Sequence, residues 1–330
     1  MSETIVLKFG GTSVGSAARV RIAARRVRAH VRRGRRVVVV VSAAGQTTDR
    51  ILAELEEIGA LGAPASAAAN ASSAGHAPPT RGADSAPHGS GEWDGVAREI
   101  DRALATGEDR SAAMLAAALC GLGTPARSLR GAEAGVLVEG DFGAGRIVAV
   151  DTEPLRRLLE RGVVPVVSGF QGVRADGETL TLGRGGSDTS AVAIAEALGA
   201  ECHIVTDVDA VYDRDPRIDP DARPFEALDY ASLVALVDAG AKVVHPAAAR
   251  IAARSGVPLR VYHFRAPIAG TGTRIAPGLF AAPAVTARGP AETAFEGSGT
   301  TPVQGPAAAP LERSTATSFE GSAATFGGTP

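Results

Sequence analysis

The sequence predicts an α/β protein with a mainly parallel sheet. Hydrophobic residues make up 45% of its 330 residues and aromatic residues only 4%, so the core must be aliphatic, which suits parallel strands buried beneath helices. Apolar runs typical of buried strands, at 4–9 and 36–42, alternate with segments of helical periodicity at 16–33 and 47–59. This order predicts right-handed βαβ units.

Most of the later segments predict short elements, and the turn of a hairpin is expected at Ala175-Asp176-Gly177. The expected helices lie at 93–105, 108–120 and 152–161, from Ser187 onward, and near 229–238 and 246–255. The expected strands lie near 126–129, 136–138 and 146–150, at 162–170, in the hairpin 171–182, and at 201–208 and 258–264.

Two stretches have almost nothing to bury. Residues 62–91 are rich in Ala, Ser, Gly and Pro, and residues 276–330 are rich in Ala, Pro, Gly, Thr and Ser. Such compositions cannot offset the entropy of ordering the chain, so they predict a disordered insert and a disordered tail. One folded domain is expected over 1–275.

Charge and composition exclude several classes of protein. The net charge of −2 argues against a general nucleic-acid binder, and the Arg-rich run 25–36 predicts a solvated helix face. The apolar run 37–41 is too short to span a membrane, and the start has no signal-peptide pattern, so a cytoplasmic protein is expected. Cys120 and Cys202 lack metal-ligand spacing and predict small core residues.

Glycine-rich loops follow several predicted strands, where open α/β sheets bind ligands. Lys8-Phe9-Gly10-Gly11-Thr12-Ser13 offers a lysine and free backbone N–H groups to an anion, although a tight βα turn explains the same residues. In the segment 42–49, Thr47 is placed to cap the next helix or to offer its hydroxyl to a ligand.

The segment 181–198 places Arg184 and Asp188 on either side of Gly185 and Gly186, at the start of a helix. Ser187 suits the N-cap, and Asp188 suits the first turn, where a carboxylate favours the helix dipole. Arg184 beside bare backbone N–H groups suits bidentate binding of a carboxylate.

Two further loops carry charge. In 206–217, carboxylates, a tyrosine and an arginine lie close together, which predicts a ligand-facing loop with internal caps, with a metal cluster as the alternative. Lys242 either complements the end of the preceding helix or reaches a phosphate, and His245 before a proline predicts a structural role. The motifs HExxH and CxxC are absent, so the cations and glycines at strand ends point to phosphoryl transfer.

In their order along the chain, these segments resemble the aspartate kinases of the amino acid kinase family. The matching segments are KFGGTSV at 8–14, SAAGQTTD at 42–49, TGEDRS at 106–111, SGFQG at 168–172, TLGRGGSDTSA at 181–191, TDVDAVYDRDPR at 206–217 and GAKVVHP at 240–246. The resemblance implies a three-layer αβα sandwich and ATP-dependent phosphorylation of the side-chain carboxylate of L-aspartate. That carboxylate is ionised at neutral pH, so the attack needs no general base.

The resemblance also implies roles for individual residues. Lys8 would contact the transferred phosphate and Asp188 would orient Lys8. The implied aspartate-binding residues are Thr47, Glu108, Arg184, Gly186 and Ser187, with Glu108 on the ammonium and Arg184 on the α-carboxylate. The implied nucleotide-binding residues are Gly10, Gly11, Thr12, Ser13, Thr206, Asp207, Tyr212, Arg217 and Lys242. Mg²⁺ would be held through the ATP phosphates and not by the protein directly.

The sequence departs from the family pattern in three places. The insert 62–91 stands where relatives carry ordered sequence, Ala210 replaces a frequent glycine, and the tail 276–330 lacks the strand pattern of the regulatory ACT domains. A homodimer through the kinase domain is the expected assembly. The alternatives are a family kinase that acts on a different amino-acid carboxylate, and a non-catalytic ligand-binding subunit.

Overall fold

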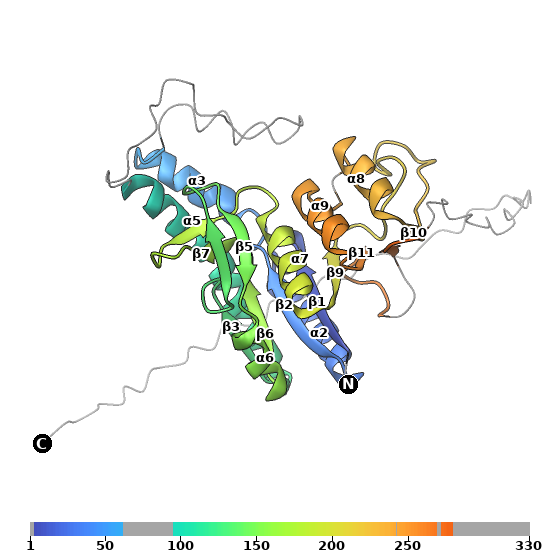
Figure 1. Ribbon diagram of the computed structural model, residues 1–330, viewed down its shortest axis with the longest axis horizontal. Helices are drawn as coiled ribbons and strands as arrows, with labels where there is room; N and C mark the ends of the chain where they lie inside the picture. The colour runs from blue at the N-terminus through green and yellow to red at the C-terminus, as the bar shows by residue number, and fades with distance from the viewer. Residues whose placement is uncertain (1–2, 62–94, 242, 269–271, 280–330) are drawn as a thin grey trace, which may run out of the picture. The chain divides into compact units, whose positions relative to one another are not determined.

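The computed structural model describes residues 3–61, 95–241, 243–268 and 272–279 of the chain (Figure 1). The predicted insert 62–91 and all but the first residues of the predicted tail 276–330 lie outside this part. The described strands are β1 (Thr4–Phe9), β2 (Arg36–Val41), β3 (Ala126–Leu129), β4 (Val136–Glu139), β5 (Arg146–Val150), β6 (Val164–Ser168), β7 (Gln171–Val173), β8 (Thr179–Thr181), β9 (Glu201–Thr206), β10 (Ala227–Leu228), β11 (Leu259–His263) and β12 (Thr273–Ile275). The described helices are α1 (Gly11–Val14), α2 (Ala17–Arg32), α3 (Thr47–Glu57), α5 (Gly95–Gly121), α6 (Glu153–Glu160), α7 (Gly186–Leu198), α8 (Tyr230–Asp238) and α9 (Pro246–Ser255).

The strands form one large sheet and one small sheet. The large sheet has the order β10-β12-β11-β9-β1-β2-β6-β3, and its pairs are parallel except for β11 with β12. The small sheet has the order β5-β4-β7-β8, and β7 and β8 form the predicted antiparallel hairpin. The prediction of a mainly parallel sheet is therefore confirmed.

Helices cover both faces of the large sheet, which makes the three-layer sandwich. Along β1 the side chains alternate: Ile5, Leu7 and Phe9 pack with α2 and α5, whereas Val6 packs with the core of α6, α7, α8 and α9 on the opposite face. All four side chains are fully buried. Burial on both faces explains why β1 and β2 are nearly continuous apolar runs and not alternating ones.

The structure corrects the prediction of two helices at 93–105 and 108–120. From Gly95 on, the described residues form the single helix α5, which continues through Gly107 to Gly121. Glycine weakens a helix on its own, but a Cβ at Gly107 would lie 2.9 Å from the Cβ of Ala43. The glycine therefore lets α5 pack closely against the loop after β2, and this tertiary contact outweighs the local preference.

Other predictions fail at single residues. Cys120 is exposed and not a core residue, whereas Cys202 is buried as expected. Within the Arg-rich run, Arg26 and His30 are buried, so the run is not a fully solvated face. Both point toward the sheet because they fall on the same side of α2 as Val27 and Ala23. Among the described helices, none is long and apolar enough to cross a membrane.

Candidate functional site

The loops with the predicted site residues gather at one edge of the large sheet. Strands β9, β1, β2 and β6 are parallel neighbours, with Phe9 paired to Val205 and Val41, and Val41 paired to Ser168. Since parallel strands end at the same edge, the segments after these strands meet there. This edge brings together residues that are far apart in the sequence.

Lys8 and Asp188 form an ion pair at this edge. The Lys8 Nζ lies 2.7 Å from the Asp188 Oδ1, and both side chains are only 12% exposed. The second carboxylate oxygen, Oδ2, accepts a hydrogen bond from the backbone N–H of His245 at 3.1 Å. Asp188 thus joins the end of β1 to the start of α9, and it holds the ammonium in one position.

The helix that carries Asp188 begins differently from the prediction. Its N-cap is Gly185, with φ of 73°, and Ser187 lies inside the first turn without capping it. A Cβ at Gly185 would lie 1.9 Å from the Cγ of His245, so both the left-handed backbone and the packed imidazole ring require glycine. The tertiary contact with His245 therefore decides the start of α7.

The other predicted residues of this loop differ in their surroundings. Ser187 is buried, and its Cβ would lie 2.9 Å from a Cβ added at Gly169. Gly186 is buried against Phe170. Arg184 is exposed, and the part of the chain that the structure describes gives it no ion-pair partner. Its guanidinium is therefore available to a bound anion.

Phe170 has a strained backbone that sequence reasoning did not identify. Its φ of 69° is unusual for a residue other than glycine, and such strain is found mostly at functional sites. Its N–H donates to the Ser190 Oγ at 3.1 Å, and its carbonyl accepts from the N–H of Leu182. These bonds fix the segment after β6 against the first turns of α7.

Glu108 is almost completely buried in α5, with 3% exposure. Its Oε1 accepts a hydrogen bond from the backbone N–H of Ala43 at 2.8 Å, whereas its Oε2 is buried without a partner among the described residues. Desolvation raises the pKa of Glu108 to about 7, against the opposing effects of the Ala43 hydrogen bond and the charge of Lys8. A cation bound at Oε2 would satisfy this oxygen and favour the charged form.

Thr47 lies close to Gly107, the residue before Glu108. Its methyl group would be 3.5 Å from a Cβ at Gly107. Its hydroxyl donates to the Ala44 carbonyl at 2.7 Å, while Gln46 takes the N-cap position of α3. The prediction that Thr47 caps the helix is therefore wrong, and its hydroxyl oxygen keeps a lone pair for another donor.

A second buried carboxylate, Asp101, connects α5 to the loop that carries Arg184. It is fully buried, and it accepts from the N–H and the hydroxyl of Thr181, each at 2.7 Å, and from the N–H of Gly143 at 2.9 Å. Gln171 makes another link, because its amide donates to the Ala105 carbonyl and to Asp109. Sequence reasoning missed both residues, since their partners lie far away along the chain.

The predicted phosphate loop after β1 is partly engaged within the protein. Gly11 packs against the loop after β2, where a Cβ would lie 2.6 Å from the Ala43 carbonyl oxygen. Ser13 is buried, and its hydroxyl donates to the Val205 carbonyl at 3.3 Å. Thr12 is exposed, and Gly10 lies beside Lys8, whose Nζ would be 3.5 Å from an added Cβ. The packed residues Gly11 and Ser13 fit a tight turn, and the exposed Thr12 with Gly10 beside Lys8 fits an anion site, so both interpretations of this loop stay open.

The predicted nucleotide residues after β9 are mostly paired with neighbours in their own loop. Tyr212 donates to Asp209 at 2.8 Å. Burial is the main reason that the Tyr212 pKa rises to about 12, and the hydrogen bond to Asp209 with its negative charge raises it further. Arg217 is exposed and pairs with Asp215 at 3.1 Å, and the Thr206 hydroxyl donates to Asp207 at 3.2 Å. The internal caps that the sequence predicted are present as well, because Asp215 accepts from the N–H of Arg217 at 3.0 Å and Asp213 accepts from the N–H of Arg223 at 2.7 Å.

Lys242 lies outside the described residues. The described ranges include no group of three or more His, Cys, Asp or Glu side chains placed to hold a metal ion, and the binding of Mg²⁺ through ATP stays a prediction. Sequence reasoning also missed Ser168, whose buried hydroxyl at the end of β6 has no partner in the described part of the chain. Only the matching segment SGFQG pointed to this position.

The fold and this edge define an α/β protein that gathers cations, glycines and a buried carboxylate at one edge of its parallel sheet. The family profile described as "Amino acid kinase family" matches residues 3–263. The chain belongs to the amino acid kinase family.

Relatives and solved structures agree with this assignment. The chain is 42% identical over 258 residues to an aspartokinase of Geobacillus stearothermophilus, covering 78% of this chain and 55% of the relative. It is similar to an aspartate kinase structure from Synechocystis, with 35% identity, a TM-score of 0.64 and coverage of 86% and 40%. It is also similar to E. coli aspartokinase III in complex with aspartate and ADP, with 26% identity, a TM-score of 0.65 and coverage of 83% and 64%. The chain spans about half the length of the curated relatives it matches.

Proposed function

We propose that the protein is an aspartate kinase, which transfers the γ-phosphoryl group of Mg-ATP to the side-chain carboxylate of L-aspartate. The product is 4-phospho-L-aspartate, the first intermediate in the synthesis of lysine, threonine and methionine. The observation that best supports this proposal is the Lys8–Asp188 ion pair at the sheet edge where the Oε2 of Glu108 has no partner in the described part of the chain. The aspartokinase relatives point to the same reaction, and the chain matches about half of their length.

The residues suit both groups of the amino acid. The Oε2 of Glu108 would accept a hydrogen bond from the substrate ammonium, with Thr47 near the same segment of α5. Arg184 would bind the α-carboxylate through two parallel hydrogen bonds. Gly186 and Ser187, in the first turn of α7, follow Arg184 in the chain; the Gly186 N–H donates to the Gly183 carbonyl at 3.1 Å, which would leave the Ser187 N–H and hydroxyl as donors to the substrate. This arrangement would leave the second carboxylate of aspartate as the nucleophile.

The chemistry then requires charge neutralisation and not proton abstraction. An oxygen of the ionised carboxylate forms a bond to the γ-phosphorus while the bond to the ADP oxygen breaks, and no proton moves. Lys8 would balance the charge on the transferred group, and Asp188 would keep that ammonium in place. The backbone around Gly10, Gly11, Thr12 and Ser13, with Thr206, Asp207, Tyr212, Arg217 and Lys242, would hold the nucleotide.

The donor set suits a polyphosphate, since Lys8 near the end of β1 and Arg217 in the loop after the neighbouring strand β9 supply positive charge. When bound, Mg²⁺ would neutralise the β- and γ-phosphates. The kinase domain at 1–275, the cytoplasmic location and the homodimer stay predictions.

A hydroxamate assay tests the proposal. The purified chain with ATP, Mg²⁺, aspartate and hydroxylamine should give aspartyl hydroxamate, because hydroxylamine traps an acyl phosphate. Lys8→Ala and Asp188→Asn should each lower kcat by a factor of about 10² to 10³. Asp238→Asn, which removes an exposed ion pair with Arg250, is the matched control and should keep wild-type kcat.

Two results would contradict the proposal. A folded wild-type chain that forms no aspartate-dependent product would support the non-catalytic alternative. Faster phosphorylation of glutamate or another amino acid than of aspartate would support a family kinase with a different substrate.

A further inference from the structure

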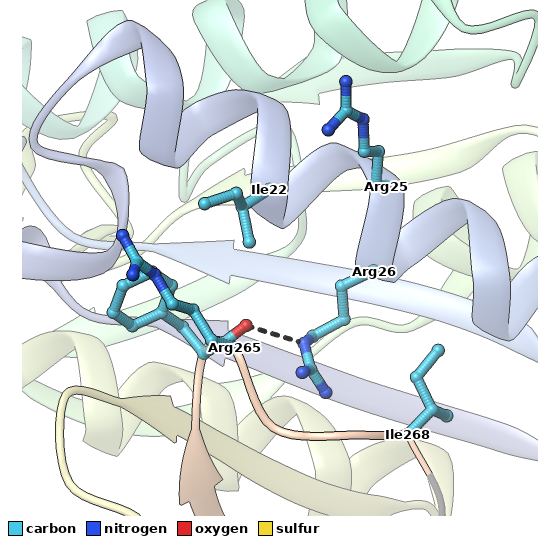
Figure 2. A pocket seen from close by; sticks show the side chains of 6 residues that line it. Ile22, Arg25, Arg26, Arg265 and Ile268 are labelled. Carbon is cyan, nitrogen blue, oxygen red and sulfur yellow. Dashed lines mark hydrogen bonds between the residues drawn. The ribbon is translucent and has the colours of Figure 1, made fainter.

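A pocket of about 340 Å³ lies between α2 and the segment that follows β11 (Figure 2), where the N–H of the lining residue Phe264 donates to the carbonyl of Thr206 at the end of β9. Figure 2 shows Arg26 extending from α2 toward the segment that carries Arg265 and Ile268. The pocket is lined by three arginines and three apolar side chains: Arg25, Arg26, Arg265, Ile22, Phe264 and Ile268. Its composition thus combines positive charge with apolar walls.

Arg26 is a buried cation without a carboxylate partner. It is only 6% exposed, and no Asp or Glu of the described residues forms an ion pair with it. Its Nε donates to the Phe264 carbonyl at 3.2 Å, its Nη2 donates to the Ala266 carbonyl, and its Nη1 is buried with no hydrogen-bond partner among the described residues. Buried charges in proteins are normally paired with an opposite charge, whereas the described residues give this guanidinium the two carbonyls and a cation–π contact, with the Tyr262 ring centroid at 5.0 Å.

Two further arginines border the same pocket. Arg25 and Arg265 are exposed, and the described residues give neither of them an ion pair. The Arg265 guanidinium lies 5.3 Å from the centroid of the Phe264 ring. In a protein with a net charge of −2, three arginines without acidic partners at one pocket create a local positive field that attracts anions.

The two kinds of arginine suit different tasks. Arg26 is fixed by two backbone carbonyls, so it presents charge at the base of the pocket without an ordering cost on binding. The exposed Arg25 and Arg265 can turn toward a ligand and bind its oxygens. Ile22 and Ile268 leave apolar surface for a nonpolar group next to the anion.

We propose that this pocket binds a small amphipathic anion, namely a phosphate ester or a carboxylate attached to an apolar or aromatic group. Arg25 and Arg265 bind the anionic oxygens directly, Arg26 adds its charge from a buried position, and the apolar group packs on Ile22, Phe264 and Ile268. The ligand is a free metabolite-sized molecule, because the pocket holds about 340 Å³, the size range of small-molecule sites. This proposal stands independently of the kinase reaction.

Titration calorimetry of the full chain with phenyl phosphate tests the proposal. Inorganic phosphate and phenol are the control ligands, because each carries only one half of phenyl phosphate, the anion or the aromatic ring. We expect phenyl phosphate to bind at least about tenfold more tightly than inorganic phosphate, and phenol to bind too weakly to detect. Equal affinity for phenyl phosphate and inorganic phosphate would overturn the role of the apolar walls, and no binding of phenyl phosphate would overturn the site.

Variants locate the binding. The double variant Arg25→Ala/Arg265→Ala should weaken phenyl phosphate binding by about tenfold or more, and it leaves the buried Arg26 intact so that the fold is kept. Arg21→Ala changes an exposed arginine of α2 that does not line the pocket, and should keep wild-type affinity. Lys8→Ala should also keep it, which separates the pocket from the candidate site. An unchanged affinity in the double variant, or an equal loss in Arg21→Ala or Lys8→Ala, would overturn the proposal.

Discussion

The two sides of the candidate site are built in opposite ways. On the side proposed for aspartate, Glu108 is 3% exposed and Asp101 is fully buried, and both accept hydrogen bonds from the backbone. On the side proposed for the nucleotide, Arg217 and Tyr212 pair with aspartates of their own exposed loop. One side is a buried polar network, and the other is a set of surface pairs.

This difference has a physical consequence. Buried polar groups interact strongly and have fixed partners, so the proposed aspartate side is preorganised. Exposed ion pairs contribute little to stability and can exchange partners at low cost. We therefore expect substitutions on the buried side to change both substrate binding and folding stability, and substitutions on the exposed side to change nucleotide binding alone.

Glu108→Gln should have the largest effect. It keeps the hydrogen bond from Ala43 but removes the charge proposed for the substrate ammonium, so KM for aspartate should rise about a hundredfold. Steady-state kinetics measure KM for aspartate in this variant, with Glu99→Gln on the exposed face of α5 as the control. An unchanged KM for aspartate would contradict the role of Glu108.

The same substitution should stabilise the folded protein at high pH. The Glu108 pKa is about 7 in the folded chain and 4.5 in the unfolded chain, so the folded state binds the proton more tightly. The cost of charging this group is absent below pH 4.5, grows as pH rises, and reaches about 3 kcal/mol above pH 7. Urea unfolding at pH 8 should therefore show a higher unfolding free energy for Glu108→Gln, and the gain should vanish near pH 4.5. A variant less stable than wild type at pH 8 would contradict the buried charge.

Asp101→Asn should have an intermediate effect. The amide cannot accept from all three of the present donors, so the link from α5 to the segment before Arg184 loosens. We expect a loss of about 1 to 3 kcal/mol in unfolding free energy and a rise of about tenfold in KM for aspartate, with KM for ATP unchanged. Equal changes in both KM values would indicate a general loss of structure and not positioning of the aspartate side.

Arg217→Ala should have the smallest effect. The arginine is exposed and, within the described residues, forms its ion pair with Asp215, so the melting temperature should stay at the wild-type value. KM for ATP should rise about fivefold while KM for aspartate stays constant. Arg214→Ala, in the same loop, is the matched control and should leave both KM values unchanged. A clear loss of thermal stability in Arg217→Ala would break the distinction between the two sides.

Most of the fold could be predicted from local sequence patterns. The strands β1, β2, β9 and β11 lie within a residue or two of their predicted limits, because buried parallel strands are continuous apolar runs. The errors occur where a distant contact decides the local structure. Gly107 stays helical because α5 packs against Ala43, and α7 begins at Gly186 because the ring of His245 packs on Gly185.

The candidate site shows the same division. The sequence placed Lys8, Thr47, Arg184 and Asp188 beside glycines at strand ends, which indicated an anion site. It did not identify Asp101, Gln171 or Phe170, because their importance lies in hydrogen bonds to distant backbone and in a strained φ. Patterns of residue type report local preference but not long-range partners.

The sequence by itself determined the α/β class, the parallel sheet and the edge where the loops meet, since these follow from apolar periodicity and from the order of strands and helices. Only the tertiary structure decided that Lys8 and Asp188 touch, that Glu108 is desolvated with a pKa of about 7, and that Arg26 is buried without a carboxylate partner among the described residues. These properties depend on desolvation and on distances between residues far apart in the chain, and packing sets both.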